Sequence, residues 1–151
     1  MIEIIQATLS HVQELSMTMN REDRDEVEGL YLKAHRVLWR GWKNSVIRKT
    51  LMIDGEVGAI WGVTGSPLAL IGHPWMLTSK KVRGMSPHTF AKLYKSEVRG
   101  LLEVFPVLWN YVDNRYVGAK RMLKIAGFKL EEPTPMGRFQ RLYRKFSIGA
   151  A

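Results

Sequence analysis

Hydrophobic and polar positions divide the first third of the chain into one strand-like and several helix-like segments. Residues 2–6 are rich in isoleucine and predict a short strand. The Thr8-Leu9-Ser10 sequence supplies capping side chains for a helix over about residues 10–20. The charged run 21–28 predicts a turn with the start of a short helix, whereas residues 30–46 have the apolar spacing of a longer helix. The apolar positions of the first helix are Val12, Leu15, Met17 and Met19.

The pattern then changes to β-branched and alternating residues. Residues 47–53 and 56–64 predict two strands, and the Asp54-Gly55 pair between them predicts a tight hairpin turn, because both central residues of such a turn need positive φ. The apolar run 68–77 predicts a further strand. Its Gly72-His73-Pro74 interruption indicates an edge position or a bulge, because proline cannot donate a hydrogen bond to a β-ladder.

Ser86-Pro87 predicts the start of the next helix, with serine as the N-cap and proline at the first helical position. We expect this helix to run to about Val104 and to end before Pro106. Residues 107–112 then predict a short buried strand.

A last helix is expected over about residues 115–126, with Asn114 as a candidate N-cap and Gly127 as the C-cap. Residues 128–130 and 139–146 predict the final strands. The element order is therefore β-α-α-β-β-β-α-β-α-β-β. This order predicts an α/β (α+β) fold, a mixed sheet with helices on both faces.

Length and composition narrow the class of protein. The chain has 151 residues, which predicts a single domain over residues 1–151. It has no cysteine, which excludes disulfide scaffolds and thiolate chemistry, and His11, His35 and His88 are too scattered to predict a metal site. No apolar run approaches the roughly 20 residues of a membrane span, and the N-terminus lacks the features of a signal peptide. A cytoplasmic protein is therefore expected.

The charge of the chain is strongly positive. Lys and Arg number 23 against 14 Asp and Glu, for a formal net charge of +9. Half of the acids lie in the first 28 residues, so the remainder is more basic still. Such a surface attracts polyanions: nucleic acid, acidic proteins or a phosphorylated cofactor.

One loop has the composition of a phosphate site. A strand leads into the Lys80-Lys81-Val82-Arg83-Gly84-Met85-Ser86 sequence, which opens a helix. Backbone N–H groups converge at a helix N-terminus and favour anions there. Glycine lets the backbone approach an anion closely, and the lysines and arginine add positive charge. The loop thus fits a pyrophosphate, although a simple helix cap with solvated lysines is the alternative.

Together with Asn114 and Gly127-Phe128, this loop resembles the GCN5-related N-acetyltransferase (GNAT) superfamily over nearly the whole chain. In that family a Gln/Arg-x-x-Gly-x-Gly/Ala loop holds the acetyl-CoA pyrophosphate, and an Asn precedes a helix that ends in Gly-Phe. The first pattern is degenerate here, with Lys81 for Gln/Arg and Ser86 for the second small residue.

The resemblance implies a mostly antiparallel sheet, transfer of an acetyl group from acetyl-CoA to an amine, and no metal. The acceptor stays open between a host protein lysine, a small amine and an N-terminus. The residues that the resemblance implies for acetyl-CoA binding are Leu77, Thr78, Lys81, Val82, Arg83, Gly84, Met85, Ser86 and Asn114.

The resemblance also bears on the catalytic residues. Many family members carry a Tyr four residues before the Gly of Gly-Phe as general acid, and here that position is Leu123. Tyr116 or Tyr111 could supply the proton instead. His73 is the best candidate base because a histidine titrates near neutral pH, with Glu56 as the alternative.

Several short strings, among them Gly72-His73-Pro74-Trp75 and Trp109-Asn110-Tyr111-Val112-Asp113, resemble a family of acetyltransferase-like and internal virion proteins of tailed bacteriophages. That resemblance implies a place in the host cytoplasm or the virion. It also supports an alternative in which the chain keeps the fold as an inactive structural or host-interaction protein. A third alternative is a nucleic-acid-binding module with basic residues on two surfaces: Arg83, Lys92, Lys95, Arg99, Arg138, Arg141, Arg144 and Lys145.

Overall fold

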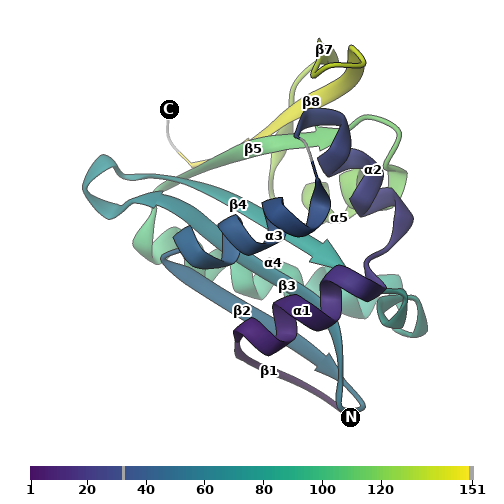
Figure 1. Cartoon of the computed structure of the whole chain (residues 1–151). Helices are drawn as coiled ribbons and strands as arrows, with labels where there is room; N and C mark the ends of the chain where they lie inside the picture. The colour runs from purple at the N-terminus through teal and green to yellow at the C-terminus, as the bar shows by residue number, and fades with distance from the viewer. Residues whose placement is uncertain (32, 150–151) are drawn as a thin grey trace. The chain divides into compact units, whose positions relative to one another are not determined.

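The computed structural model describes residues 1–31 and 33–149 (Figure 1). Their contacts form two compact units. Unit 1 comprises Met1–Thr64 and Trp75–Met85, and unit 2 comprises Gly65–Pro74 and Ser86–Ala151. Strands β3 (Glu56–Ser66) and β4 (Ile71–Thr78) each contribute residues to both units. That the chain forms a single domain stays a prediction.

Unit 1 is built on an antiparallel hairpin. Strand β2 (Ile47–Ile53) pairs with β3, and β1 (Ile2–Gln6) pairs with the other edge of β2. The turn is Asp54-Gly55, with φ of 50° and 80°, which confirms the predicted hairpin. The N-terminal ammonium of Met1 lies 2.5 Å from the Asp54 carboxylate, so β1 is also tied to this turn.

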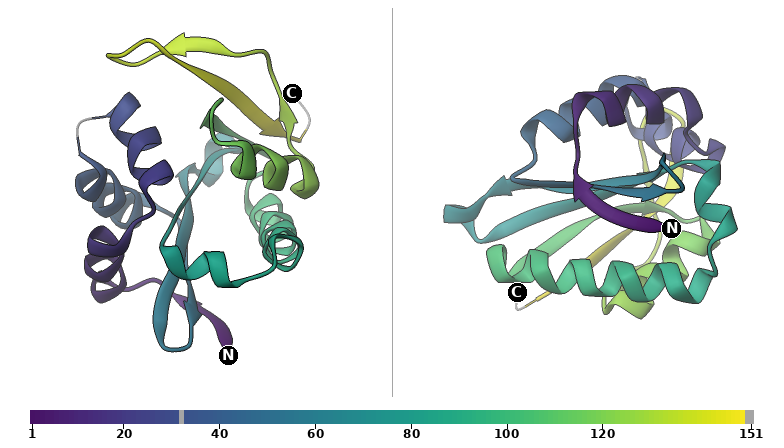
Figure 2. Two further views of the ribbon diagram at one scale, coloured as in Figure 1. Left: turned by 90° about the vertical axis from the view of Figure 1, so that its right-hand side faces the viewer. Right: turned by 90° about the horizontal axis from the view of Figure 1, so that it is seen from below.

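Three helices cover one face of the unit 1 strands (Figure 2). The predicted helix 10–20 is α1 (Leu9–Thr18), and the charged segment is a full helix, α2 (Arg21–Leu30), not a turn. The predicted helix 30–46 is the shorter α3 (Ala34–Asn44), and position 32 lies outside the described residues. The acids of the α2 first turn stabilise the positive end of its dipole, which the sequence reading overlooked.

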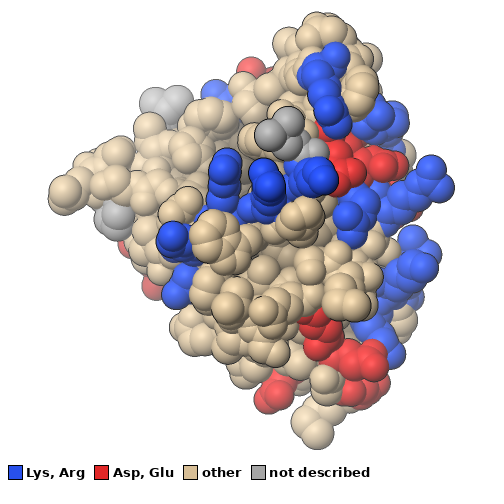
Figure 3. All heavy atoms as spheres, in the orientation of Figure 1, with Lys and Arg blue, Asp and Glu red and all other residues tan. Residues whose placement is uncertain are grey.

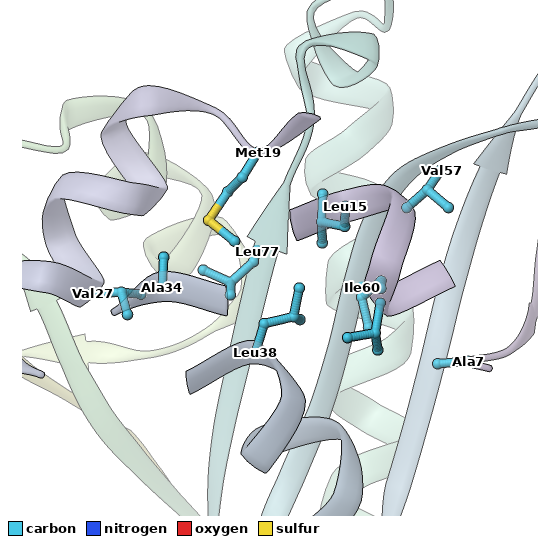
Figure 4. Packing of buried hydrophobic residues seen from close by; sticks show 10 residues of the cluster. Ala7, Leu15, Met19, Val27, Ala34, Leu38, Val57, Ile60 and Leu77 are labelled. Atoms are coloured by element: carbon cyan, nitrogen blue, oxygen red, sulfur yellow. The ribbon is translucent and has the colours of Figure 1, made fainter. Parts of the chain in front are cut away.

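The core of unit 1 lies between these helices and the strands (Figure 4). Leu15 of α1 and Leu38 of α3 are fully buried and lie near Ile60 of β3. Met17, predicted as an apolar helix position, is instead 86% exposed, because it lies on the face of α1 opposite the buried Val12 and Leu15. The buried cluster comprises Ala7, Val12, Leu15, Met19, Val27, Ala34, Leu38, Val57, Ile60 and Leu77.

Unit 2 places two packed helices, α4 and α5, beside a sheet. The helix predicted from Ser86-Pro87 is confirmed: the Ser86 hydroxyl accepts a hydrogen bond from the Thr89 N–H. Gly127 has φ of 105° and is the expected left-handed C-cap. The elements are the short 3-10 turn Pro67–Ala69, α4 (Pro87–Val104), β5 (Val107–Asp113), α5 (Val117–Ala126), β6 (Lys129–Leu130), β7 (Thr134–Met136) and β8 (Arg141–Ile148).

The hydrogen-bonded strands follow the order β1-β2-β3-β4-β5-β8-β6, with β7 beside β8. The sheet is mixed and mostly antiparallel, as predicted. The expected element order is wrong in two places, because it lacks the helix α2 and the three-residue strand β7. A segment as short as β7 carries no readable period, and only its pairing with β8 makes it a strand.

Two local expectations in unit 2 are wrong. Asn114 does not cap α5, which begins at Val117 after an uncapped Tyr116. The Asn114 N–H donates to the Leu142 carbonyl and so extends the pairing of β5 with β8. Pro74 does not lie on an edge strand either, since β4 has a hydrogen-bonded neighbour on each side. No helix within the described residues is long and apolar enough to cross a membrane.

Candidate functional site

The parallel pairing between β4 and β5 in unit 2 is short. Its register contains Ile71↔Val107 and Gly72↔Leu108, and the Val107 N–H donates to the Leu70 carbonyl. The N–H and C=O of one strand residue point to the same side, and alternate residues point alike, so Leu70, Gly72 and Pro74 all face β5. Pro74 has no N–H to offer there. The backbone pairing of β4 with β5 therefore ends before Pro74.

Side chains replace the backbone ladder beyond this point. The Asn110 amide donates to the Pro74 carbonyl at 2.9 Å, while its own oxygen accepts from the Tyr111 N–H at 2.8 Å. The His73 Nδ1 lies 3.1 Å from the Trp109 carbonyl oxygen. Because a carbonyl only accepts, Nδ1 carries the proton and the lone pair of the neutral ring is on Nε2. This is the tautomer that a base acting through Nε2 requires.

Aromatic side chains pack beside His73. Its ring meets the Trp109 ring edge-on at 4.5 Å between centroids, and Trp109 meets Tyr111 in the same way at 5.8 Å. The Lys145 ammonium lies 4.6 Å from the centre of the Trp109 ring. All four side chains are half-buried. The predicted base is therefore fixed in orientation by backbone and aromatic contacts.

The junction of β5 with α5 holds an ion pair between a buried carboxylate and an exposed guanidinium, which sequence reasoning missed. Asp113 is 3% exposed, and both of its oxygens accept from the Arg115 guanidinium, the shortest contact being 2.7 Å. Burial raises the pKa of this carboxyl, but hydrogen bonds and charge from Arg115, with the charge of Arg141, outweigh burial and hold the pKa below its ordinary value. A strand-final Asp two residues before an Arg was the available signal.

The two predicted residues at this junction have different surroundings. The Asn114 oxygen accepts from the Lys120 ammonium at 3.1 Å, so this side chain is held against α5 rather than capping it. Tyr116 is half-buried and immediately precedes α5. Leu123, at the position where the resemblance implies a tyrosine, is 4% exposed and packs as a core residue.

The predicted phosphate loop forms the 3-10 turn η2 (Lys80–Gly84) in unit 1. The Ser79 hydroxyl accepts from the Lys81 N–H at 3.2 Å, and the Val82 carbonyl accepts from the Met85 N–H at 3.0 Å. The Lys81 ammonium lies 2.6 Å from the Glu56 carboxylate, whose hydrogen bond and charge raise the lysine pKa. The paired side chains are about half exposed, so such an ion pair is weak and readily exchanged.

Gly84 is the residue of this loop with the most open surroundings. A Cβ built on it meets no atom within 4 Å, and its φ is not in the left-handed region. The fold itself therefore gives no reason for glycine at this position. Arg83, next to it, lies 3.6 Å from the Glu22 carboxylate in an exposed pair.

Leu77 and Thr78 differ from the rest of the predicted set because they are buried. Leu77 belongs to the core of unit 1. The Thr78 N–H and hydroxyl both donate to Asp23 of α2, and its hydroxyl accepts from Asn20 at 2.8 Å. These contacts attach α2 to the end of β4. The sequence offered no sign of them, since Asn20 was expected at the end of the first helix and Asp23 in a charged turn.

The predicted residues divide between the two units. Unit 1 contains seven of them: Leu77, Thr78, Lys81, Val82, Arg83, Gly84 and Met85. Unit 2 contains His73, Ser86, Asn114 and Tyr116. Among the described residues, no three His, Asp or Glu side chains gather as a metal site would require.

Comparison with solved structures finds acetyltransferases over the full length of the chain. An acetyltransferase of the GNAT family from Streptococcus pneumoniae is 14% identical, with 98% of each chain covered and a TM-score of 0.66. AAC(6')-Ib, solved in complex with ribostamycin and coenzyme A, is 12% identical, with 98% of this chain and 93% of that chain covered and a TM-score of 0.70.

A third similar structure is the ribosomal-protein-S18-alanine N-acetyltransferase from Escherichia coli, 11% identical, with 100% of this chain and 96% of that chain covered and a TM-score of 0.66. Comparisons with protein-family models and with curated protein sequences find no match. The chain therefore has the GNAT-like acetyltransferase fold. Its resemblance to phage proteins has no counterpart among these structures and stays a prediction.

Proposed function

We propose that this protein is an N-acyltransferase that transfers the acetyl group of acetyl-CoA to an amine. The observation that carries the proposal is the early end of the β4–β5 ladder at Pro74, in a chain that matches acetyltransferases over its whole length. One of those structures was solved with coenzyme A bound. Beyond Pro74 side chains rather than backbone groups join the two strands, so the extended part of a bound ligand can compete for the same polar groups.

The residues of η2 fit the phosphates of such a ligand. Gly84 has room for close backbone approach, and Lys81 and Arg83 have charges that now face exposed carboxylates. Phosphate oxygens bind both cations as well as a carboxylate does. We propose the binding set predicted above, with the Leu77 and Thr78 side chains in supporting positions, since both are buried.

His73 and Tyr116 are the proposed acid–base pair. The acceptor nitrogen attacks the thioester carbonyl carbon, the carbon–sulfur bond breaks, and His73 Nε2 takes the proton that the nitrogen releases. Tyr116 gives its proton to the departing thiolate. The tautomer fixed by the Trp109 carbonyl supports the first role. The position of Tyr116 supports the second, because the half-buried side chain lies at the N-terminal end of α5, where the helix dipole favours a nearby anion.

Calorimetric titration with acetyl-CoA tests the binding half of the proposal. Gly84→Val should weaken binding at least about tenfold, because its side chain fills the space that the backbone needs for a charge-assisted contact. Lys81→Ala should cost less, about 1–2 kcal/mol. Gly100→Val is the matched control, since its Cβ also meets nothing within 4 Å but it lies within α4. Unchanged affinity in folded Gly84→Val contradicts the assignment.

A coenzyme-release assay with a basic protein, a peptide N-terminus and a small polyamine tests the chemistry and ranks the acceptors. One observation favours a second function: Leu123 is a packed core residue where relatives carry the acid. If acetyl-CoA binds and no acceptor releases coenzyme, the protein has kept the fold for interaction. That outcome would fit the inactive structural or host-interaction protein that the phage resemblance implies.

A further inference from the structure

Helix α3 presents a row of positive side chains to solvent. Arg36, Arg40 and Lys43 are all exposed and recur at the spacing of one helix face, opposite the buried Ala34 and Leu38. Figure 3 shows Lys and Arg gathered in a row over this helix. The segment from 29 to 53 contains six Lys or Arg and no Asp or Glu. The positive charge of the chain is therefore locally concentrated at this row, and the row is more basic than an even spread of the net charge would make it.

These three cations have no acidic partner among the described residues, in contrast to other cations of unit 1. Lys81 pairs with Glu56, and Arg83 pairs with Glu22. The carboxylate at the N-terminal end of α3 is that of Glu28, and it accepts the Ala34 N–H at 3.1 Å. A row of unpaired cations holds mobile counterions, which a polyanion displaces with a gain in free energy.

Trp39 lies within this row and is 42% exposed. The neighbouring Trp42 explains itself structurally, because its indole N–H donates to the Ala7 carbonyl and Arg48 covers its ring at 4.4 Å. For Trp39 the described contact is the flexible Lys43 ammonium, 4.8 Å from the ring centre. A large planar ring between cations is a stacking surface for a flat, negatively charged ligand.

The other basic surfaces differ from the α3 row. Lys92 and Arg99 are exposed on α4, where the aromatic residue Tyr94 is buried. Phe139 at the β7–β8 turn is exposed, but Arg138 and Arg141 already lie 4.7 and 4.8 Å from its ring centre. The α3 row differs in that its ring is an indole, the larger stacking surface, and in that one ammonium rather than two guanidinium groups contacts that ring.

We infer that the exposed face of α3 binds single-stranded nucleic acid, with phosphates on Arg36, Arg40 and Lys43 and a base stacked on Trp39. Charge complementarity selects a polyanion, and the exposed indole selects one that carries planar groups. An acidic peptide satisfies the first condition but not the second. The inference does not depend on the proposed acetyl transfer, because none of these four residues belongs to the proposed acetyl-CoA set.

Fluorescence anisotropy with a labelled oligothymidylate of about 12 nucleotides, a length within the usual site sizes, tests the inference. Affinity is measured between about 50 and 200 mM salt, because each phosphate contact to a single strand contributes about 0.7 to the slope of log K against log salt. The Arg36→Ala/Arg40→Ala variant should lower that slope by about 1.4. Lys92→Ala/Arg99→Ala removes the same charge from α4 and should leave the slope unchanged.

Trp39→Ala should weaken binding about tenfold at constant salt, whereas Phe139→Ala should not. Equal losses in the two double variants would overturn the inference, because net charge alone would then explain the binding. Polyglutamate that competes as well as the oligonucleotide, with no effect of Trp39→Ala, would also overturn it in favour of an acidic protein partner. Circular dichroism confirms that each variant is folded.

Discussion

The β2–β3 hairpin of unit 1 and the β4–β5 pair of unit 2 show opposite ways of joining two strands. The hairpin is paired along its length, from Ile47↔Val63 at its open end to Ile53↔Glu56 beside the turn, with one irregularity at Leu51/Met52. The β4–β5 register covers two pairs. Two residues bring the hairpin strands together, whereas the whole of α4 separates β4 from β5.

This difference shows that the residues at the turn and along the strands decide how far the backbone hydrogen bonds of a strand pair extend. Asp54-Gly55 adopts the positive φ that a tight turn needs, so pairing begins at the turn and continues. In β4 the proline withholds an N–H from the side that faces β5, and the Asn110 side chain takes the carbonyl that is left. The closed pair is joined by backbone hydrogen bonds along its length, whereas the short pair depends on side-chain hydrogen bonds beyond Pro74.

The largest expected effect tests whether the short ladder is where chemistry occurs. Tyr116→Phe should lower the transfer rate about 10²–10⁴-fold, the range for loss of a general acid, with little change in acetyl-CoA affinity. Tyr111→Phe is the matched control, since Tyr111 is the other tyrosine of this region. His73→Ala should lower the transfer rate over the same range, as expected for loss of a general base. If both Tyr116→Phe and His73→Ala keep the wild-type rate, neither side chain is the catalyst.

A smaller effect is expected from breaking the closed hairpin. A Cβ at Gly62 would lie 2.7 Å from the Ile47 carbonyl oxygen and 2.8 Å from the Ser45 hydroxyl. Gly62→Ala should therefore destabilise the protein by about 1–3 kcal/mol in urea unfolding, the cost of overpacking. The control Gly100→Ala has open space around its Cβ and should stabilise α4 by about 0.5–1 kcal/mol. A neutral Gly62→Ala would show that β2 and β3 tolerate separation.

Removing the Asn110 side chain, which takes the place of a backbone hydrogen-bond donor between β4 and β5, should destabilise the protein less than Gly62→Ala does. Asn110→Ala leaves the buried Pro74 carbonyl without its donor and should destabilise by about 1 kcal/mol in the same assay. Asn110→Asp keeps the oxygen that accepts the Tyr111 N–H but lacks the donor. If the donated hydrogen bond matters, both variants lose similar stability. Full stability in Asn110→Asp would assign the effect to the Tyr111 contact instead.

The smallest effect is a pH dependence in the closed region. The His11 Nδ1 accepts from the Thr8 N–H at 3.1 Å and contacts the Thr50 hydroxyl of β2 at 2.9 Å. Burial lowers the His11 pKa from 6.5, while the charge of Glu14 partly opposes this. The unfolded chain then binds the proton more strongly, so stability should be full above pH 6.5 and fall as the pH drops below it.

His11→Asn provides the control for this dependence. Asparagine can present an oxygen near the position of Nδ1, and it does not titrate. Urea unfolding from pH 7.5 to about 5 should therefore show a smaller loss of stability in the variant than in the wild type. Identical curves for the two proteins would place the titrating group elsewhere.

Local sequence determined the parts of this fold in which a few neighbouring residues set the backbone. Asp54-Gly55, Ser86-Pro87 and Gly127 were read correctly because positive φ, capping and proline geometry act within a few residues. The charged helix α2 was not, because its stability comes from Val27 in the core and Asp23 on Thr78, two contacts that charge pattern does not reveal. The mostly antiparallel sheet was predicted from the resemblance to the GNAT superfamily over nearly the whole chain.

Tertiary structure alone decided what each candidate residue contacts. The sequence marked Pro74 as a disruption, but only the sheet order placed it inside, on the side that faces β5. Asn114 has the chemistry of a cap, yet its N–H goes to Leu142, a residue distant in the chain. Leu77 and Thr78 looked like site residues and are buried. Hydrogen bonds between distant segments compete with local preferences, and which of them wins is fixed only when the chain packs.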